Sequence, residues 1–419
     1  MIDPASGRDE VGDVCILDGK IVEASAVGSD AEVLDLKGMV CVPGFIDIHT
    51  HLREPGREDK ETIFSGTRAA AAGGFTSVCP IPNTTPVIDS QTGLKFIIAR
   101  AEQEGCVNVF PYAAVTKGQM GEEIVEFGDL VQNGARGFTD DGRPVMNTEI
   151  MRRALEFSAM FGVPILDHCE DAFLAHGGCM HEGNVSERLG LKGIAAVAES
   201  LHVARDVELA ALTGGHIHIM HVSKKESLKH VRRGKAEGVR VTAEVTPHHL
   251  TLTDDSLAEF NTYAKVNPPM GTDEDRLALI EAFKDGTIDC VATDHAPHTD
   301  IEKDYPITEC PFGAIGLETA FPVLYTHLVK TGIVTLPFLI EKMTIAPAKI
   351  LKLDPRGTLQ VGAPADITIL DLNAEYEVTN ANFFGKSKNS PYVGHTLSGR
   401  IVRTFVAGKS VFHEGKFAE

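Results

Sequence analysis

The middle of the chain alternates between short apolar runs and longer amphipathic stretches. Stretches of helical period, for example 64–74, 148–162 and 225–238, each end near a glycine. The runs between them are continuously apolar, as expected for parallel strands covered on both faces. Eight such strands are predicted, at 45–52, 76–83, 107–115, 135–141, 163–170, 216–223, 240–250 and 288–298. Eight strands alternating with helices predict an α/β fold, a (β/α)8 barrel of the TIM type.

The two ends of the chain follow a different pattern. Residues 11–44 and 357–412 contain short segments broken by Asp-Gly, Gly-Lys and Gly-Ala turns, which is typical of antiparallel strands. We therefore expect residues 1–43 and 350–419 to pair into one small β-sandwich domain beside a barrel of residues 44–349. The first of these strands begins with almost no lead-in, which leaves open whether a further N-terminal strand belongs to it.

Composition excludes several classes of protein. The 419 residues are 43% hydrophobic and 23% charged, which is ordinary for soluble globular proteins. No apolar run reaches the roughly 18 residues of a membrane span, and the first residues do not resemble a signal peptide, so we expect a cytoplasmic protein. A net charge of −20 argues against nucleic acid or anionic membrane as a partner. The eight cysteines form no CxxC pair and are expected to be reduced thiols.

Polar side chains collect where the predicted strands end. The carboxyl ends of the strands carry the active site in barrels of this kind. The polar residues found there are His49, His51, Arg53, Asn83, Asp140, Asp141, His168, His221, Asn267, Asp294 and His298.

The histidines in this set predict a metal site. His49 and His51 are two positions apart on a strand and therefore point to the same side. Two imidazoles so placed can bind one metal with a carboxylate from another strand. His168 and His221, each of which alone would suggest a core histidine, bring the imidazoles to four, more than one zinc usually takes from protein. Two metals sharing a carboxylate account for all four, and Asp141 is the candidate bridge, although its sequence also fits an Asp-Gly turn.

Three further residues indicate how a substrate is held and converted. Asp294 can ligate a metal and can also accept a proton from water whose pKa the metal has lowered. Arg53 lies just past the first strand, where a guanidinium suits a bidentate hold on a substrate carboxylate. His298 faces either the substrate or its own loop. A structural role is favoured for the other polar residues near these ends, Asp140, His248 and His249.

Six motifs together resemble those of the amidohydrolase superfamily and, within it, the bacterial type I dihydroorotases: DIHTHLREPG, GFTDDG, DHCED, HVS, NPP and ATDHAPH. The resemblance runs over residues 11–409. Many superfamily members bridge their metals with a carboxylated lysine, whereas GFTDDG has aspartate there, as in the type I branch. The resemblance implies six ligands for one or two Zn²⁺ ions: His49, His51 and Asp294 for the deeper ion, His168 and His221 for the more exposed ion, and Asp141 as the bridge.

The resemblance also implies a substrate and a reaction. N-carbamoyl-L-aspartate would close reversibly to L-dihydroorotate plus water in de novo pyrimidine (UMP) synthesis, through a metal-activated hydroxide with Asp294 as general acid and base. Relatives of this type often associate with aspartate transcarbamoylase, and a homodimer is compatible with the sequence. The implied substrate contacts are Arg53, Asn83 and His298 for the carboxylate, Asn267 for the pyrimidine ring, and the backbone of Phe312 and Gly313 in the loop 308–319.

Two other functions compete with this interpretation. A hydantoinase or dihydropyrimidinase acts on cyclic amides that need no carboxylate, so Arg53 with Asn83, and the absent bridging lysine, argue against it. An inactive homologue that serves as a scaffold would have lost ligands, whereas all six are present here.

Overall fold

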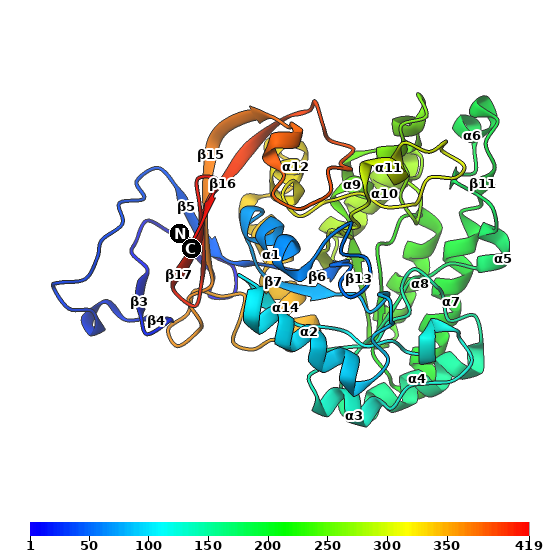
Figure 1. The fold of residues 1–419 in the computed structure, drawn as a ribbon, viewed down its shortest axis with the longest axis horizontal. Helices are drawn as coiled ribbons and strands as arrows, with labels where there is room; N and C mark the ends of the chain where they lie inside the picture. Colours follow the sequence, from blue (N-terminus) through cyan, green and yellow to red (C-terminus); the bar gives the residue numbers. More distant parts are fainter. Residues whose placement is uncertain (419) are drawn as a thin grey trace.

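The predicted strands form a closed parallel barrel in the computed structural model, which describes residues 1–418 (Figure 1). Two parallel sheets contribute the ladders: β6 (Phe45–Thr50), β7 (Phe75–Pro80) and β8 (Asn108–Val109), and β9 (Ile165–Asp167), β12 (Ile217–Ile219), β13 (Val241–Val245) and β14 (Cys290–Val291). Single bridges join the two sheets at both edges. Phe138 is bridged to Ala113 and Ile165, and Thr50 is bridged to His295, so the ring is closed.

The fourth place in the barrel is occupied by one bridging residue instead of a strand. The prediction of a full strand at 135–141 is wrong, because Phe138 alone is bridged there. The Asp140 carboxylate accepts hydrogen bonds from the backbone N–H groups of Val115 (2.8 Å) and Thr116 (3.1 Å). A side chain thus takes the place of the next ladder partner and ends the pairing.

The seven strands that form are all shorter than predicted, down to two residues each for β8 and β14, and the seventh shows one cause. The expected strand at 240–250 ends at Val245, and helix α9 (Pro247–Thr251) follows it. The hydroxyl of Thr246 accepts a hydrogen bond from the backbone N–H of His249 (3.1 Å), and Pro247 occupies the first helical position. Both features favour the start of a helix over continuation of a strand.

Helices cover the barrel and begin and end at the capping signals of the sequence. The Thr62 side chain caps α1 by accepting from Ser65 N at 3.1 Å, and α4 ends at Gly162 with φ 69°. No helix within residues 1–418 is both long and apolar enough to span a bilayer. The α-helices besides α9 are α1 (Ile63–Ala72), α2 (Gln91–Glu104), α3 (Phe127–Gln132), α4 (Thr148–Phe161), α5 (Ala172–Ala175), α6 (Asn184–Leu189), α7 (Val197–Thr213), α8 (Lys225–Ala236), α10 (Asp273–Lys284), α11 (Asp300–Lys303), α12 (Ala320–Leu324), α13 (Leu336–Met343) and α14 (Ile345–Ile350).

The two ends of the chain meet beside the barrel (Figure 1). Strand β5 of the N-terminal segment pairs antiparallel with β15 of the C-terminal segment. Ile21 packs in one cluster with Ile367, Ile369 and Phe405, which joins the N-terminal hairpin to this sheet. The predicted β-sandwich of terminal segments is therefore confirmed, while its division from the barrel at 43/44 and 349/350 stays a prediction. Its strands are β1 (Ile2–Asp3), β2 (Arg8–Asp9), β3 (Cys15–Leu17), β4 (Lys20–Val22), β5 (Val40–Pro43), β15 (Ile367–Glu377), β16 (Thr396–Val406), β17 (Lys409–His413) and β18 (Lys416–Phe417).

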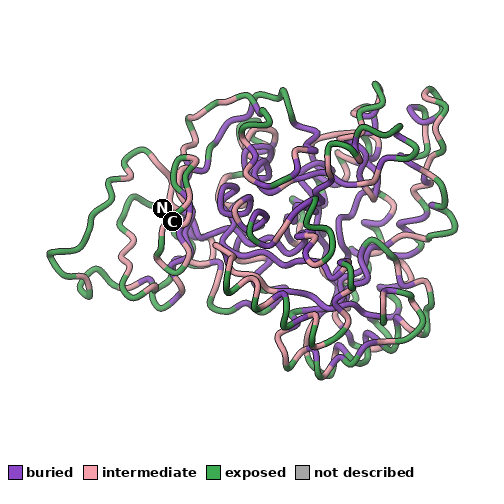
Figure 2. Tube along the Cα trace, in the orientation of Figure 1, coloured by how far each residue is buried: buried purple, intermediate pink, exposed green. Residues whose placement is uncertain are grey.

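An apolar core fills the barrel interior. Ile46, Ile48 and Leu166 point into it and form one cluster with Leu351 and Leu353, which follow α14. Burial is concentrated in the barrel, whereas the segment between β4 and β5 is largely exposed (Figure 2). The interior is therefore a packed core, and its polar residues gather at the carboxyl ends of the strands.

Candidate metal centre and substrate pocket

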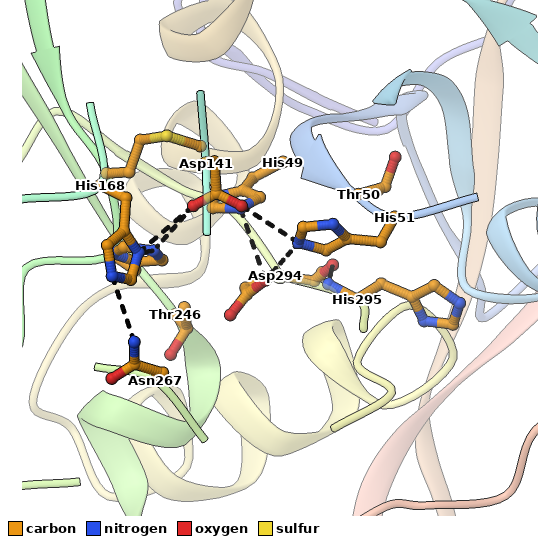
Figure 3. A network of polar contacts seen from close by, with 12 residues as sticks. His49, Thr50, His51, Asp141, His168, Thr246, Asn267, Asp294 and His295 are labelled. Atoms are coloured by element: carbon orange, nitrogen blue, oxygen red, sulfur yellow. Dashed lines mark hydrogen bonds and ion pairs between the residues drawn. The ribbon is translucent and has the colours of Figure 1, made fainter. Parts of the chain in front are cut away.

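The six predicted metal ligands lie together at the carboxyl ends of the barrel strands, and Figure 3 labels all of them except His221. Each is at least nine-tenths buried. His221 (φ 31°) and Asp294 (φ 49°) have left-handed backbone conformations that side chains rarely adopt. Strain of this kind is typical of functional sites, where the surrounding structure holds a side chain in one direction.

Asp141 lies between two pairs of imidazoles. Its Oδ2 is 3.6 Å from His49 Nε2 and 3.5 Å from His51 Nε2. Its Oδ1 is 3.3 Å from His168 Nδ1 and 3.4 Å from His221 Nε2. One carboxylate oxygen therefore faces each pair, which is the arrangement that a bridge between two cations requires.

Asp294 completes the group around the first pair. Its Oδ1 is 3.4 Å from His49 Nε2 and 3.0 Å from His51 Nε2. His49 Nε2 is buried and has no hydrogen-bond partner among the described residues. A buried lone pair facing two carboxylates fits a metal ion, and imidazole with carboxylate is a donor set suited to Zn²⁺. His49, His51 and Asp294 form one group that could hold an ion, and His49, Asp141 and His221 form a second.

Hydrogen bonds to the far side of the rings fix the tautomers of the first pair. His49 Nδ1 lies 2.6 Å from Glu244 Oε1, and His51 Nδ1 lies 3.1 Å from Asn83 Oδ1. Both oxygens can only accept, so each Nδ1 carries the proton and each Nε2 keeps its lone pair for a metal. Glu244 also accepts from the backbone N–H of His221 (3.2 Å), so one buried carboxylate orients ligands on β6 and after β12.

The carboxylates and imidazoles of the cluster shift one another's pKa. Burial alone would raise the pKa of Asp141, but the imidazoles, His49 foremost, hold it well below its usual value. Burial alone would lower the pKa of His168, yet Asp141 and Glu170 raise it to about 10. The cluster thus favours positive charge. Without metal, protons on the imidazoles provide this charge, and a divalent cation that binds would displace those protons and provide it instead.

Arg53 and His298, two of the predicted substrate contacts, lie against each other. Arg53 has φ 62°, and its Nε donates to the carbonyl of Pro297 at 3.2 Å. Its Nη2 lies 3.3 Å from His298 Nε2. The pKa of Arg53 falls to about 10 because the group is buried, and it remains charged at neutral pH. A fixed, half-buried positive charge at this place can receive an anionic substrate.

Of the predicted ring contacts, Asn267 lies beside His168 and the loop with Phe312 and Gly313 lies beside His298. Asn267 Nδ2 is 3.2 Å from His168 Nε2. The loop with Phe312 is held close because Gly313 N donates to the carbonyl of Lys265 at 2.9 Å. Gly313 has φ 131°, and a Cβ there would lie 3.0 Å from His298 Nε2, so this position has no room for a side chain.

Two cavities open at this end of the barrel. One of about 540 Å³ is lined in part by Asn267, Phe312 and Arg143. The other, of about 470 Å³, is lined in part by Asn83, Asp141 and Arg143. Both are of the size of small-molecule sites, roughly 300–1,000 Å³. Three of the predicted substrate contacts, Asn83, Asn267 and Phe312, thus border space that a small molecule can enter.

Asp140 and His249 have structural hydrogen bonds, whereas no hydrogen bond among the described residues accounts for the ring of His248. The Asp140 carboxylate accepts hydrogen bonds from the backbone N–H groups of residues 115 and 116, as described above. His249 contacts the Thr246 hydroxyl (2.8 Å) and the Pro268 carbonyl (3.0 Å) through its two ring nitrogens. His248 is buried, and its Nε2 has no hydrogen-bond partner among residues 1–418.

Sequence reasoning missed Glu244 and Lys60, which both touch predicted site residues. Glu244 had a detectable signal, because it is the single charged side chain in the apolar run VTAEVT (241–246), and a buried charge needs a partner. The sequence around Lys60 gave no such signal, since Lys60 lies in the polar segment REDKET (57–62), whose composition predicts an exposed segment. The structure buries Lys60 and brings its Nζ to 3.0 Å from His298 Nδ1.

The comparisons with known proteins agree with this geometry. A family model described as "Dihydro-orotase-like" matches residues 38–227, and one described as "Amidohydrolase family" matches residues 201–412. The dihydroorotase of Pelotomaculum thermopropionicum is 50% identical over 416 residues, covering 99% of this chain and 97% of that protein. A dihydroorotase of Staphylococcus epidermidis is 48% identical over 406 residues, covering 96% of this chain and 95% of that protein.

Solved structures support the same fold. The L-hydantoinase of Arthrobacter aurescens superposes with a TM-score of 0.87 at 26% identity, covering 97% of this chain and 93% of that one. A D-hydantoinase superposes with a TM-score of 0.83 at 21% identity, which supports the fold alone. About half of the residues are shared with curated dihydroorotases over nearly the full length, and this chain therefore belongs to the dihydroorotase family of amidohydrolases.

Proposed function

We propose that this chain is a zinc-dependent dihydroorotase that interconverts N-carbamoyl-L-aspartate and L-dihydroorotate plus water in pyrimidine biosynthesis. The observation that carries the proposal is the position of Asp141, with one oxygen facing each pair of imidazoles. A family relationship over the full chain supports the same reaction. An aspartate at this place and a half-buried guanidinium beside the centre distinguish the site from one built for neutral cyclic amides.

The six ligands of the proposed centre would hold one or two zinc ions. His49, His51 and Asp294 form one group, His168 and His221 lie 3.0 Å apart through their ring nitrogens, and Asp141 contacts both sets. Zinc bound there would polarise the amide carbonyl of the ring as a Lewis acid and provide an activated water nucleophile at neutral pH.

Asp294 is the proposed general acid and base. Burial would raise its pKa, but His49 and His51 lower it overall, so the carboxylate is ionised at neutral pH and can accept a proton. In hydrolysis it takes the proton of the attacking water and delivers it to the ring nitrogen that leaves the C4 carbonyl. In synthesis the same carboxylate takes the proton from the ureido nitrogen as the ring closes.

The remaining predicted residues would bind the substrate. Arg53, Asn83 and His298 would hold the carboxylate that stays outside the reacting amide, and Asn267 with the backbone of the loop at Phe312 would meet the ring. The net charge of the chain is −20, so binding of an anionic substrate depends on local positive charge at the carboxyl ends of the barrel strands. The half-buried Arg53 provides it.

Closure of N-carbamoyl-L-aspartate by the purified protein, with bound metal quantified in the same sample, tests the proposal. Turnover that disappears in Asp294→Ala, with at least one zinc per chain, is the expected result. Faster turnover of hydantoin or dihydrouracil would replace it with the hydantoinase alternative. Neither metal nor turnover after zinc is resupplied would favour the inactive scaffold.

We also propose that the protein works in the cytoplasm, forms a homodimer and associates with aspartate transcarbamoylase. Its absolute molar mass in solution, measured alone and with that enzyme, tests both associations. A monomer that stays separate from aspartate transcarbamoylase at micromolar concentration, with full activity, would contradict them.

A further inference from the structure

His298 lies between two cationic side chains that can both donate only. Lys60 Nζ is 3.0 Å from its Nδ1, and Arg53 Nη2 is 3.3 Å from its Nε2. A neutral imidazole has one nitrogen with a lone pair and one N–H, whereas ammonium and guanidinium groups have no acceptor. One of these two contacts is therefore a hydrogen bond, and the other places two donors against each other.

The contact with Lys60 is the hydrogen bond. Lys60 is the closer of the two cations, its side chain is only 5% exposed, and Glu302 Oε1 holds its ammonium at 2.8 Å. Glu302 is itself fixed, because its carboxylate accepts from Thr299 N at 3.2 Å. Burial, and then the charges of Arg53 and Lys60, keep the pKa of His298 well below its usual value, so the ring is neutral.

We infer that Lys60 is a positioning residue that sets the tautomer of His298: its ammonium donates to Nδ1, which leaves the proton on Nε2 facing Arg53 Nη2. The two donors then form a pair that one substrate carboxylate accepts from together. The identity of that substrate rests on the function proposed above, whereas the tautomer does not.

This arrangement links Lys60 to substrate selection. A carboxylate has lone pairs for both the Nε2–H and the Nη2–H groups, so it relieves the contact between two donors. A cyclic amide without a carboxylate leaves the two donors facing each other. Lys60 thus favours carboxylate-bearing substrates without touching them.

Nitrogen NMR of ¹⁵N-histidine-labelled, zinc-loaded enzyme reads the tautomer directly, with His298→Gln to assign the signals. The expected ring in the wild type is protonated on Nε2 alone. In Lys60→Met, Arg53 is the remaining cationic donor to the ring, so the proton moves to Nδ1. The Michaelis constant for L-dihydroorotate then rises by about 10- to 100-fold, as for one lost hydrogen bond to a charged group, while kcat changes by about twofold or less.

Arg57→Gln is the matched control for charge. Arg57 is 44% exposed and pairs with the same Glu302 oxygen at 3.1 Å, but the structure gives it no hydrogen bond to His298. This variant removes an equal charge and is expected to keep the tautomer, with a Michaelis constant within about threefold of the wild type, since its screened, exposed pair contributes little.

A wild-type ring protonated on Nδ1 would overturn the inference, and this measurement needs no variant. An unchanged tautomer in Lys60→Met would overturn it too, as would an equal rise in the Michaelis constant in Arg57→Gln. If the wild type does not turn over L-dihydroorotate, the proposed function fails, and the NMR signals still decide the tautomer.

Discussion

Glu244→Gln should weaken metal binding without unfolding the barrel. Glu244 is fully buried and accepts from His49 Nδ1 (2.6 Å), His218 Nε2 (3.1 Å) and His221 N (3.2 Å). Glutamine keeps the shape, but only one of its two polar atoms accepts, and it carries no charge. The hydrogen bond that makes His49 a good ligand therefore weakens.

The expected loss is a 10- to 100-fold rise in the dissociation constant for zinc, the usual effect of removing the partner behind a metal-ligating histidine. This corresponds to about 1.4–2.8 kcal/mol. Because a ligand stabilises the folded state by RT ln(1 + [L]/Kd), the zinc-loaded variant should lose the same amount of unfolding free energy at a fixed excess of zinc. The metal-free variant should change less, since it has no zinc contribution to lose.

Competition with a chromophoric chelator measures the zinc affinity, and denaturant unfolding with and without zinc measures the stability. Glu199→Gln is the control, because Glu199 is also a buried carboxylate, accepts from Ser223 N (3.1 Å) and Ser227 Oγ (2.6 Å) and, within residues 1–418, forms no ion pair or hydrogen bond with the six ligands. A dissociation constant for Glu244→Gln within twofold of the wild type would refute the reasoning, as would an equal destabilisation of its metal-free form.

Four further outcomes test other parts of the site. Asp294→Ala should lower kcat by about 100-fold or more, measured at saturating substrate, because the proton carrier is lost; a smaller effect would move that role to another group. Arg53→Met should raise the Michaelis constant for L-dihydroorotate by about 10- to 100-fold through loss of a charged hydrogen bond, and an unchanged constant would contradict its role. Tyr112→Phe should lower the free energy of unfolding by about 1–3 kcal/mol in denaturant titrations. The reason is that the buried Tyr112 hydroxyl donates to the Ile48 carbonyl at 2.9 Å. An unchanged free energy would mean that this carbonyl finds another donor. Dialysis against a chelator should abolish turnover and lower the melting temperature, with both restored by zinc; activity that survives complete metal removal would exclude the proposed centre.

The fold was accessible from the sequence because the barrel repeats a local pattern. Apolar runs such as 45–52 become parallel strands, and Thr62 and Gly162 mark helix ends through contacts with near neighbours in the chain. The errors arise where a side chain competes with the backbone. Asp140 ends the pairing at Phe138, and Thr246 with Pro247 turns the expected end of a strand into a helix.

The sequence by itself determined which residues end the barrel strands, and with them the set from His49 to Asp294, because parallel strands in a closed ring bring their carboxyl ends to one face. Tertiary structure alone decided what each atom does there. The orientation of Asp141 between two imidazole pairs, the hydrogen bond from His49 to Glu244 across 195 positions, and the contact of Lys60 with His298 across 238 positions follow from barrel closure and loop packing. No local pattern encodes these contacts, because each depends on the direction of two side chains that only the completed fold brings within hydrogen-bonding distance.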